Sequence, residues 1–290
     1  MLLRELLRNY NWSIADATDS IRTCQDTLSS GAAELLIIDD SPTRPASITL
    51  RELQANPLTY LTPTICFSTT HNRNEHEILN QLGSPTIAQK PLTPEKFIPK
   101  LKLNQKIWSG KFYPQIRKAA LFLINDQQAS GLELLLKVNE IPEAQLHVAP
   151  ALARFYFELG NFKIAEKVLL TALKSHPGSL NITLALTDIY MTASMPGLAL
   201  RLLKSTVKRF PSSLTLKPDL IQAAIMKDEL DIAIEHLMKM HLADFQKLTV
   251  EKMLAKCLYA DGREHEIISS QLHNASEQQL AGSWEKVVVK

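Results

Sequence analysis

Residues of the same character return every 34 positions in the C-terminal two thirds of this 290-residue chain. Gly160, Asp228 and Gly262 lie one or two such steps apart, and from about Lys111 onward the apolar spacing is helical, without strand signals. A period of this length indicates stacked helix pairs, because a single pair cannot bury its apolar face alone. The other residues in phase are Tyr156 and Tyr190, Ala165, Ala199 and Ala233, Leu169, Leu203 and Leu237, and Pro177 and Pro211.

The repeated units share a pattern of small and large residues. The clearest unit reads Ala149-x2-Leu152-Ala153-x2-Tyr156, followed by Ala165-x3-Leu169-x2-Ala172-x4-Pro177. It resembles a tetratricopeptide repeat in which Ala149 replaces the opening Trp. Small residues let paired helices approach closely, while Leu and Tyr fill the groove between them. Weaker units precede and follow at the same phase, so we expect about five helix pairs over residues 115–281 and a C-terminal tail at 282–290.

The resemblance to tetratricopeptide repeats implies an α-solenoid that binds a protein partner along its inner face. The first helix of each pair would line this groove. The mixture of aromatic, Met and charged side chains in this groove would suit an extended or helical segment of a partner. The expected groove residues are Arg154, Phe157, Asp188, Met191, Gln222, Met226, Lys256 and Tyr259.

The first third of the chain alternates short apolar runs with helix-like segments. The apolar runs lie at 33–39, 63–68 and 86–91, where the last is the weaker signal, and 13–17 is a further candidate strand. Helices are expected at 2–9, 19–28, 47–54, 74–82 and 94–103. This alternation predicts right-handed crossovers and a parallel sheet that is covered by helices on both faces.

Three segments of this part resemble the receiver domain of bacterial response regulators. They are Glu34-Leu-Leu-Ile-Ile-Asp39, Pro63-Thr-Ile-Cys-Phe-Ser68 and Lys90-Pro91. The resemblance implies a flavodoxin-like α/β domain over 1–103, with Asp39 as the phosphoacceptor where the strand ends. It also implies that Lys90 pairs with the phosphate, that Ser68 hydrogen-bonds a phosphate oxygen and moves as a switch, and that the bond after Lys90 is cis. Asp40 is the alternative acceptor, but Asp39 falls five residues after Glu34, which is the register of the family.

The chain departs from the receiver family at its start. No apolar strand ending in two acidic residues precedes the first helix-like segment, so the acidic pair that holds a divalent metal is missing. Magnesium is therefore expected only with an upstream acidic pair, and no other cofactor or metal is expected, since His71 and His76 do not share a helical face. A start further upstream, a degenerate pseudo-receiver and a partner chain that supplies the strand are all open. Unpaired strand edges and repeat ends also leave a homodimer open.

Composition argues against several classes of protein. Basic residues number 32 and acidic residues 30, so a nucleic-acid-binding face is not expected. No run approaches the ~18 apolar residues of a membrane-spanning helix, and the N-terminus lacks the apolar core of a signal peptide. Cys24, Cys66 and Cys257 are scattered, which suits a reducing compartment, and we expect the cytoplasm. No paired carboxylates, nucleophile triad or cofactor loop supports an enzyme.

Both parts together indicate a two-component-type signalling adaptor. The receiver-like domain would accept phosphate from a histidine kinase or another phosphodonor, or dock a partner, and the repeats would bind an effector protein. A linker at 104–114, which contains Trp108, Phe112 and Tyr113, would pack the two domains together and transmit a switch from Ser68 and Lys90. The alternative is a phosphorylation-independent scaffold or chaperone-like protein in motility, secretion or surface-structure assembly.

Overall fold

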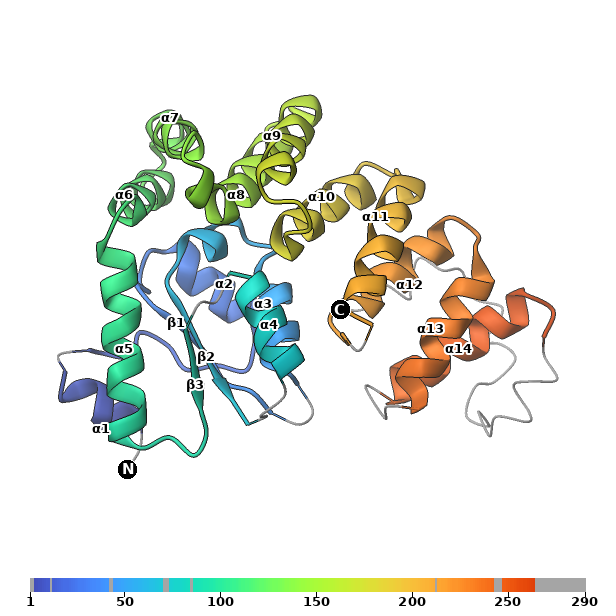
Figure 1. Cartoon of the computed structure of the whole chain (residues 1–290), viewed down its shortest axis with the longest axis horizontal. Helices are drawn as coiled ribbons and strands as arrows, with labels where there is room; N and C mark the ends of the chain where they lie inside the picture. The colour runs from blue at the N-terminus through green and yellow to red at the C-terminus, as the bar shows by residue number, and fades with distance from the viewer. Residues whose placement is uncertain are drawn as a thin grey trace. The chain divides into compact units, whose positions relative to one another are not determined.

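The computed structural model of the chain is mostly helical and contains one small parallel sheet (Figure 1). It describes residues 3–10, 12–41, 44–69, 73–83, 86–211, 213–242 and 247–263. The chain forms two compact units, Met1–Ile189 and Tyr190–Lys290, whose boundary falls within helix α10 (Leu180–Thr192). None of the described helices is long and apolar enough to cross a membrane.

The sheet lies in the first unit and contains the strands predicted in the apolar runs 33–39, 63–68 and 86–91. β1 (Leu36–Ile38), β2 (Thr64–Ser68) and β3 (Thr86–Gln89) run parallel in this order. The central strand, β2, is buried along its whole length. Its unbroken apolar run follows from this position, because a central strand of a parallel sheet has helices on both faces.

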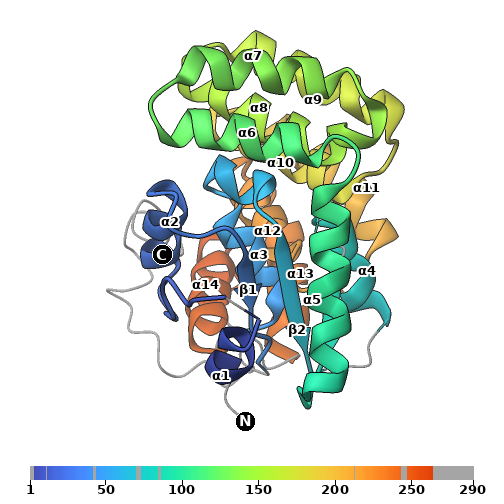
Figure 2. The same cartoon turned by 90° about the vertical axis from the view of Figure 1, so that its left-hand side faces the viewer.

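Helices cover both faces of the sheet. Figures 1 and 2 show α5 on one side and α3 with α4 on the other. On the α5 side, Phe97 packs edge-to-face on Phe67, with ring centroids 5.5 Å apart, and Leu101 and Ile65 belong to the same core cluster. The helices of this part are α1 (Leu3–Arg8), α2 (Ile21–Ser29), α3 (Ala46–Leu53), the 3-10 helix η1 (Pro57–Leu61), α4 (Arg73–Gln81) and α5 (Pro94–Ser109).

The prediction of a strand at 13–17 is wrong: residues 12–20 form no strand. The Asp16 carboxylate accepts a hydrogen bond from the amide of Ala17 at 2.8 Å, a local contact that competes with strand pairing. Trp12 and Ile14 pack against the core on the α5 side instead. Within the described residues β1 pairs only with β2, so its other edge carries no strand.

Residues 104–114 do not form the expected linker. α5 continues through them to Ser109, and α6 begins at Tyr113. Asn104 explains the continuation: it is only 2% exposed, and its side-chain amide donates to the Thr64 carbonyl at 3.1 Å and to the Thr86 hydroxyl at 3.2 Å. These two bonds tie the second half of α5 to the first residues of β2 and β3.

The aromatic residues expected between the two domains do pack the α/β part against the first repeats. Trp108 and Phe112 are buried in one core with Leu58 and Tyr60 of η1, and this core continues into α6, α7 and α8. Figure 2 shows these helices across one end of the sheet. The α/β part and the first helix pairs therefore form one compact unit, and the boundary between units lies much later, after Ile189.

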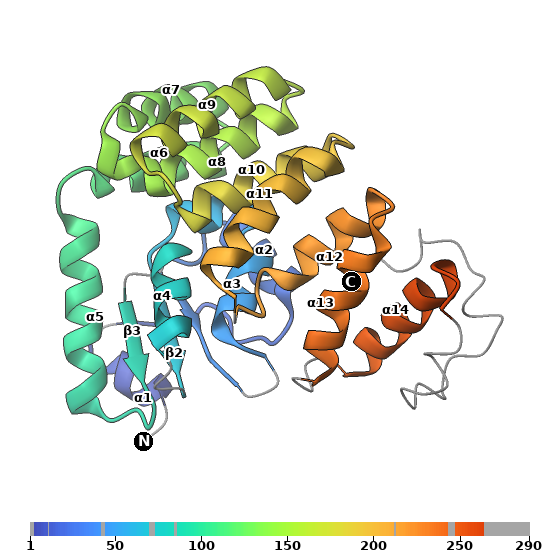
Figure 3. The ribbon, with the colours of Figure 1, turned by 45° about the vertical axis from the view of Figure 1, so that its right-hand side comes forward.

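From Tyr113 onward the described chain consists of helices joined by short turns. Neighbouring helices pack side by side, as Figure 3 shows for α11 to α14 in the second unit. The expected repeats beyond residue 263 and the tail at 282–290 lie outside the described residues. The helices are α6 (Tyr113–Ile124), α7 (Gln128–Asn139), α8 (Gln145–Glu158), α9 (Phe162–Ser175), α10, α11 (Pro196–Arg209), α12 (Lys217–Met226), α13 (Leu230–Leu242) and α14 (Lys247–Ala260), with the 3-10 helix η2 (Pro142–Ala144) before α8.

The turn between helices is the same at five places, each 34 residues from the next. Asp126, Gly160, Ser194, Asp228 and Gly262 all have positive φ, between 58° and 76°. After each of them, the next backbone N–H donates to the carbonyl five residues earlier, at 2.8–2.9 Å. This is the hydrogen bond of a Schellman helix cap, which satisfies a carbonyl at the end of the first helix. The helical period inferred from the sequence is thus confirmed at the level of the backbone.

Candidate functional site

Three residues of the expected receiver-like site meet at the carboxyl ends of the parallel strands. Asp39 follows β1, Ser68 ends β2 and Lys90 follows β3. The Lys90 ammonium lies 2.6 Å from the Asp39 carboxylate and donates to the Asp40 carbonyl at 2.8 Å. The Lys90 amide donates to the Ser68 carbonyl at 2.9 Å, and the bond between Lys90 and Pro91 is cis. The structure therefore brings Asp39, Ser68 and Lys90 to one edge of the sheet.

The two neighbouring aspartates have opposite surroundings. The Asp39 side chain is 67% exposed, while Asp40 is only 4% exposed. One Asp40 oxygen accepts from the Ala46 amide at 3.0 Å, and the other accepts from the Thr69 amide and hydroxyl at 3.0 and 2.9 Å. Asp40 thus joins the start of α3 to the residue after β2, and Asp39 is the carboxylate that solvent reaches.

Ser68 is almost fully buried and lies against a histidine that sequence analysis did not place at this site. The imidazole Nε2 of His76 on α4 is 3.3 Å from the Ser68 hydroxyl. Beside it, Glu75 accepts from the Ser47 amide at 3.4 Å, and burial raises the pKa of the Glu75 carboxyl, with a contribution from the negative charge of Asp40. The sequence pattern paired His76 with His71, which lies outside the described residues.

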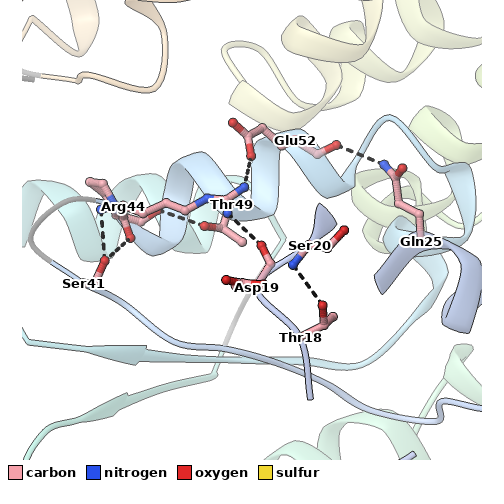
Figure 4. Close-up of polar contacts among 9 residues, drawn as sticks. Thr18, Asp19, Ser20, Gln25, Ser41, Arg44, Thr49 and Glu52 are labelled. Atoms are coloured by element: carbon pink, nitrogen blue, oxygen red, sulfur yellow. Dashed lines mark hydrogen bonds and ion pairs between the residues drawn. The ribbon is translucent and has the colours of Figure 1, made fainter. Parts of the chain in front are cut away.

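The segment after Asp40 is held by polar contacts at the start of α3 (Figure 4). The Arg44 guanidinium donates to the Asp19 carbonyl at 3.1 Å and pairs with Glu52 on α3 at 2.5 Å. The Ser41 hydroxyl accepts from the Arg44 amide at 3.0 Å. These contacts connect the loop that follows the site both to α3 and to the residues before α2.

The residues present do not fit the divalent metal site of a receiver domain. Both Asp40 oxygens are occupied by donors within the chain, which leaves Asp39 as the one exposed carboxylate, and it already pairs with Lys90. In the part of the chain that the structure describes, no three His, Cys, Asp or Glu side chains gather closely enough to hold a metal ion. A hard cation such as Mg²⁺ needs oxygen ligands in near-octahedral arrangement, and one carboxylate does not supply them.

One of the expected groove residues has a different role. Asp188 forms a paired contact with the Arg51 guanidinium of α3, in which Arg51 Nη1 donates to Asp188 Oδ2 at 2.8 Å and Nη2 contacts Oδ1. The contact crosses 137 residues of sequence, so the spacing within the repeats does not predict it. Asp188 therefore attaches α10 to the α/β part and is not available to a partner in this structure.

The other expected groove residues are divided between the two units. In the first unit, Arg154 pairs with Glu158 on the same helix at 3.2 Å, and Phe157 contacts Phe162 edge-to-face. The exposed ones in the second unit are Gln222, Met226 and Tyr259, while Met191 and Lys256 are half-buried.

Comparisons with known proteins add no family assignment. No protein-family model matches the chain, and the search of curated proteins found no match.

Proposed function

We propose that this protein is a signalling adaptor. Its α/β part resembles a receiver domain and would accept phosphate on Asp39, and its helical repeats would bind an effector protein. The observation that supports the proposal most is the meeting of Asp39, Ser68 and Lys90 at the carboxyl ends of three adjacent parallel strands. Ligands and reactive groups of open parallel sheets gather at this edge.

The chemistry of the proposed step follows from the surroundings of each side chain. The exposed Asp39 carboxylate would attack the phosphorus of a small phosphodonor, form an acyl phosphate and release the donor's leaving group. Lys90 already lies 2.6 Å from this carboxylate and would offset the charge of the phosphoryl oxygens. The Ser68 hydroxyl lies 3.3 Å from the His76 imidazole and would donate its own proton to a phosphate oxygen, while its lone pairs accept from His76.

A second candidate is a phosphorylation-independent scaffold, in which the receiver-like part only docks a partner. It is favoured by the absence of a three-ligand metal cluster among the described residues. Without a metal ion, the Lys90 ammonium alone would have to balance the negative charge of the phosphoryl group, and phosphate transfer to Asp39 would be slow.

One experiment separates the two candidates. The full chain is incubated with acetyl phosphate, with and without Mg²⁺, and its intact mass is measured. The adaptor proposal expects the mass of one phosphoryl group on the wild type and on D26N, an exposed aspartate of α2, but not on D39N. The absence of phosphate from the wild type under every condition would refute acceptance by Asp39 and leave the scaffold.

A further inference from the structure

The second unit carries two clefts of opposite charge at one edge of its helices. The first, of about 410 Å³, lies between the start of α11 and the turn that joins α12 to α13. The second, of about 460 Å³, lies between the start of α13 and the end of α14. We call them the basic cleft (Met195, Leu198, Arg201, Lys204, Lys227 and Glu229) and the acidic cleft (Asp228, Glu229, Leu230, Asp231, Ile232 and Asp261), which share Glu229.

The basic cleft contains three cations and one carboxylate. Glu229 accepts from Lys204 at 2.7 Å and from Lys227 at 3.1 Å, which lowers the pKa of the Glu229 carboxyl. Arg201 is exposed and forms no ion pair with any described residue. Met195 is 39% exposed and supplies apolar surface beside these charges. The cleft therefore has an excess of positive charge next to an apolar wall.

The acidic cleft contains three aspartates and Glu229, which it shares with the basic cleft, and one cation lies nearby. Arg263 lies 3.5 Å from Asp231 and 3.7 Å from Asp261, and the Asp231 side chain is 88% exposed. These long contacts leave an excess of negative charge beside Ile232. No three metal-ligating side chains gather here or elsewhere among the described residues, so the acidic cleft is not a metal site.

The repeat places the two clefts at equivalent positions. Met195 and Glu229, Leu198 and Ile232, and Lys227 and Asp261 are each 34 residues apart. Residues of the same phase in a stack of helix pairs lie on the same edge. Two consecutive repeats thus present the same cleft with opposite charge.

We propose that this edge binds an extended peptide segment of a partner protein. The segment would place an acidic group with an apolar neighbour in the basic cleft and a basic group in the adjacent acidic cleft. Complementary charges fix the direction and register of such a segment, because the reversed segment would face like charges. A nucleic acid would fit the first cleft but would be repelled by the second. This inference is independent of phosphate transfer to Asp39.

The test uses the full chain and a fluorescein-labelled peptide with the sequence Glu-Leu-Asp-Phe-Gly-Ser-Lys-Leu-Arg-Lys, followed by fluorescence anisotropy at low ionic strength. We expect binding that weakens about tenfold, or ~1.4 kcal/mol, in the double variant R201E and K227E, and equally in D231K and D261K. The matched control is K208E with K252E, two exposed lysines outside the clefts, in which affinity should change less than about twofold.

A second peptide separates charge complementarity from general attraction. When its Glu and Asp are replaced by Gln and Asn, the R201E and K227E variant should bind it as well as the wild type does. The proposal is overturned if the wild type does not bind the charged peptide up to millimolar concentration, or if the control variant loses as much affinity as the cleft variants. Far-UV circular dichroism checks that each double variant is folded; R201A replaces the basic-cleft variant and D231N the acidic-cleft variant if either is not.

Discussion

We predict that the buried histidine of α8 makes the stability of the first unit depend on pH. His147 lies beside Trp108 and Tyr113, with ring centroids 5.8 and 5.5 Å away, and its Nε2 is 3.3 Å from the Tyr113 hydroxyl. No carboxylate of a described residue contributes to the protonation of the imidazole, and burial lowers the pKa of His147 from 6.5 to about 4.

The sign and size of the effect follow from this pKa. Between pH 6.5 and pH 4 the unfolded chain binds a proton at His147 and the folded chain does not, so stability rises with pH in this window. The contribution is present above about pH 6.5 and is lost as the pH falls toward 4. One pKa unit corresponds to about 1.4 kcal/mol, so the full loss is about 3 kcal/mol, of which about 2 kcal/mol falls between pH 7 and pH 5.

The assay is urea unfolding of the wild type and of H147Q at pH 7 and pH 5, followed by tryptophan fluorescence, because Trp108 is buried against this site. Glutamine keeps a neutral polar group near Tyr113 but cannot be protonated. The wild type should lose about 2 kcal/mol more than H147Q on going from pH 7 to pH 5. The comparison cancels the other titrating groups, such as Glu75, whose raised pKa acts in the opposite direction, and His236, whose lowered pKa acts in the same direction.

A control is S175A, a change at an exposed residue without a titrating group at the end of α9, which should keep the pH dependence of the wild type. The reasoning is refuted if H147Q and the wild type lose the same stability between pH 7 and pH 5, since His147 would then be as easily protonated in the folded chain as in the unfolded one.

Two further predictions concern contacts that the structure assigns to stability. R51A should lower the free energy of unfolding by about 2 kcal/mol, because it leaves the Asp188 carboxylate without this partner. The loss is smaller than for a fully buried pair, since the Asp188 side chain is 26% exposed. In a urea double-mutant cycle, R51A with D188N should cost less than the sum of the single changes. At the repeated turn, S194G should raise the free energy of unfolding by about 1 kcal/mol and G160A should lower it by about as much, because both positions have positive φ; equal effects of the two changes would contradict this reading of the turn.

The period of the helices could be predicted because it is carried by local residues. Glycines at 160 and 262 mark two of the five turns, since glycine reaches positive φ without steric cost. Asp126 and Ser194 occupy the same turn, but neither residue type is restricted to positive φ, so sequence alone did not distinguish them. The backbone hydrogen bond that closes each turn forms whether the residue with positive φ is glycine or carries a side chain, as at Asp126 and Ser194.

The boundary between the units could not be predicted in the same way. The charged sequence around Lys102 and Lys106 is typical of a solvated segment, and sequence analysis ended the helix at residue 103. Asn104 and Trp108 face inward from the same stretch, one toward the two strand starts and the other into the core shared with η1. Both partners are distant in sequence, so only the folded chain reveals that α5 continues and that the first repeats belong to the α/β unit.

Asp39 is exposed and Asp40 is buried for a physical reason, which only partly follows from the sequence. Successive residues at the end of a strand point to opposite sides, so one of two adjacent acids is directed toward solvent and the other toward the protein. The sequence does not say which residue takes which direction. The direction depends on which residue meets hydrogen-bond donors inside the protein. Here the donors are the amides of Ala46 and Thr69, which belong to two different loops. A buried carboxylate needs such donors to be tolerated, whereas Asp39, the proposed phosphate acceptor, lies in solvent beside Lys90 and needs none of the backbone donors.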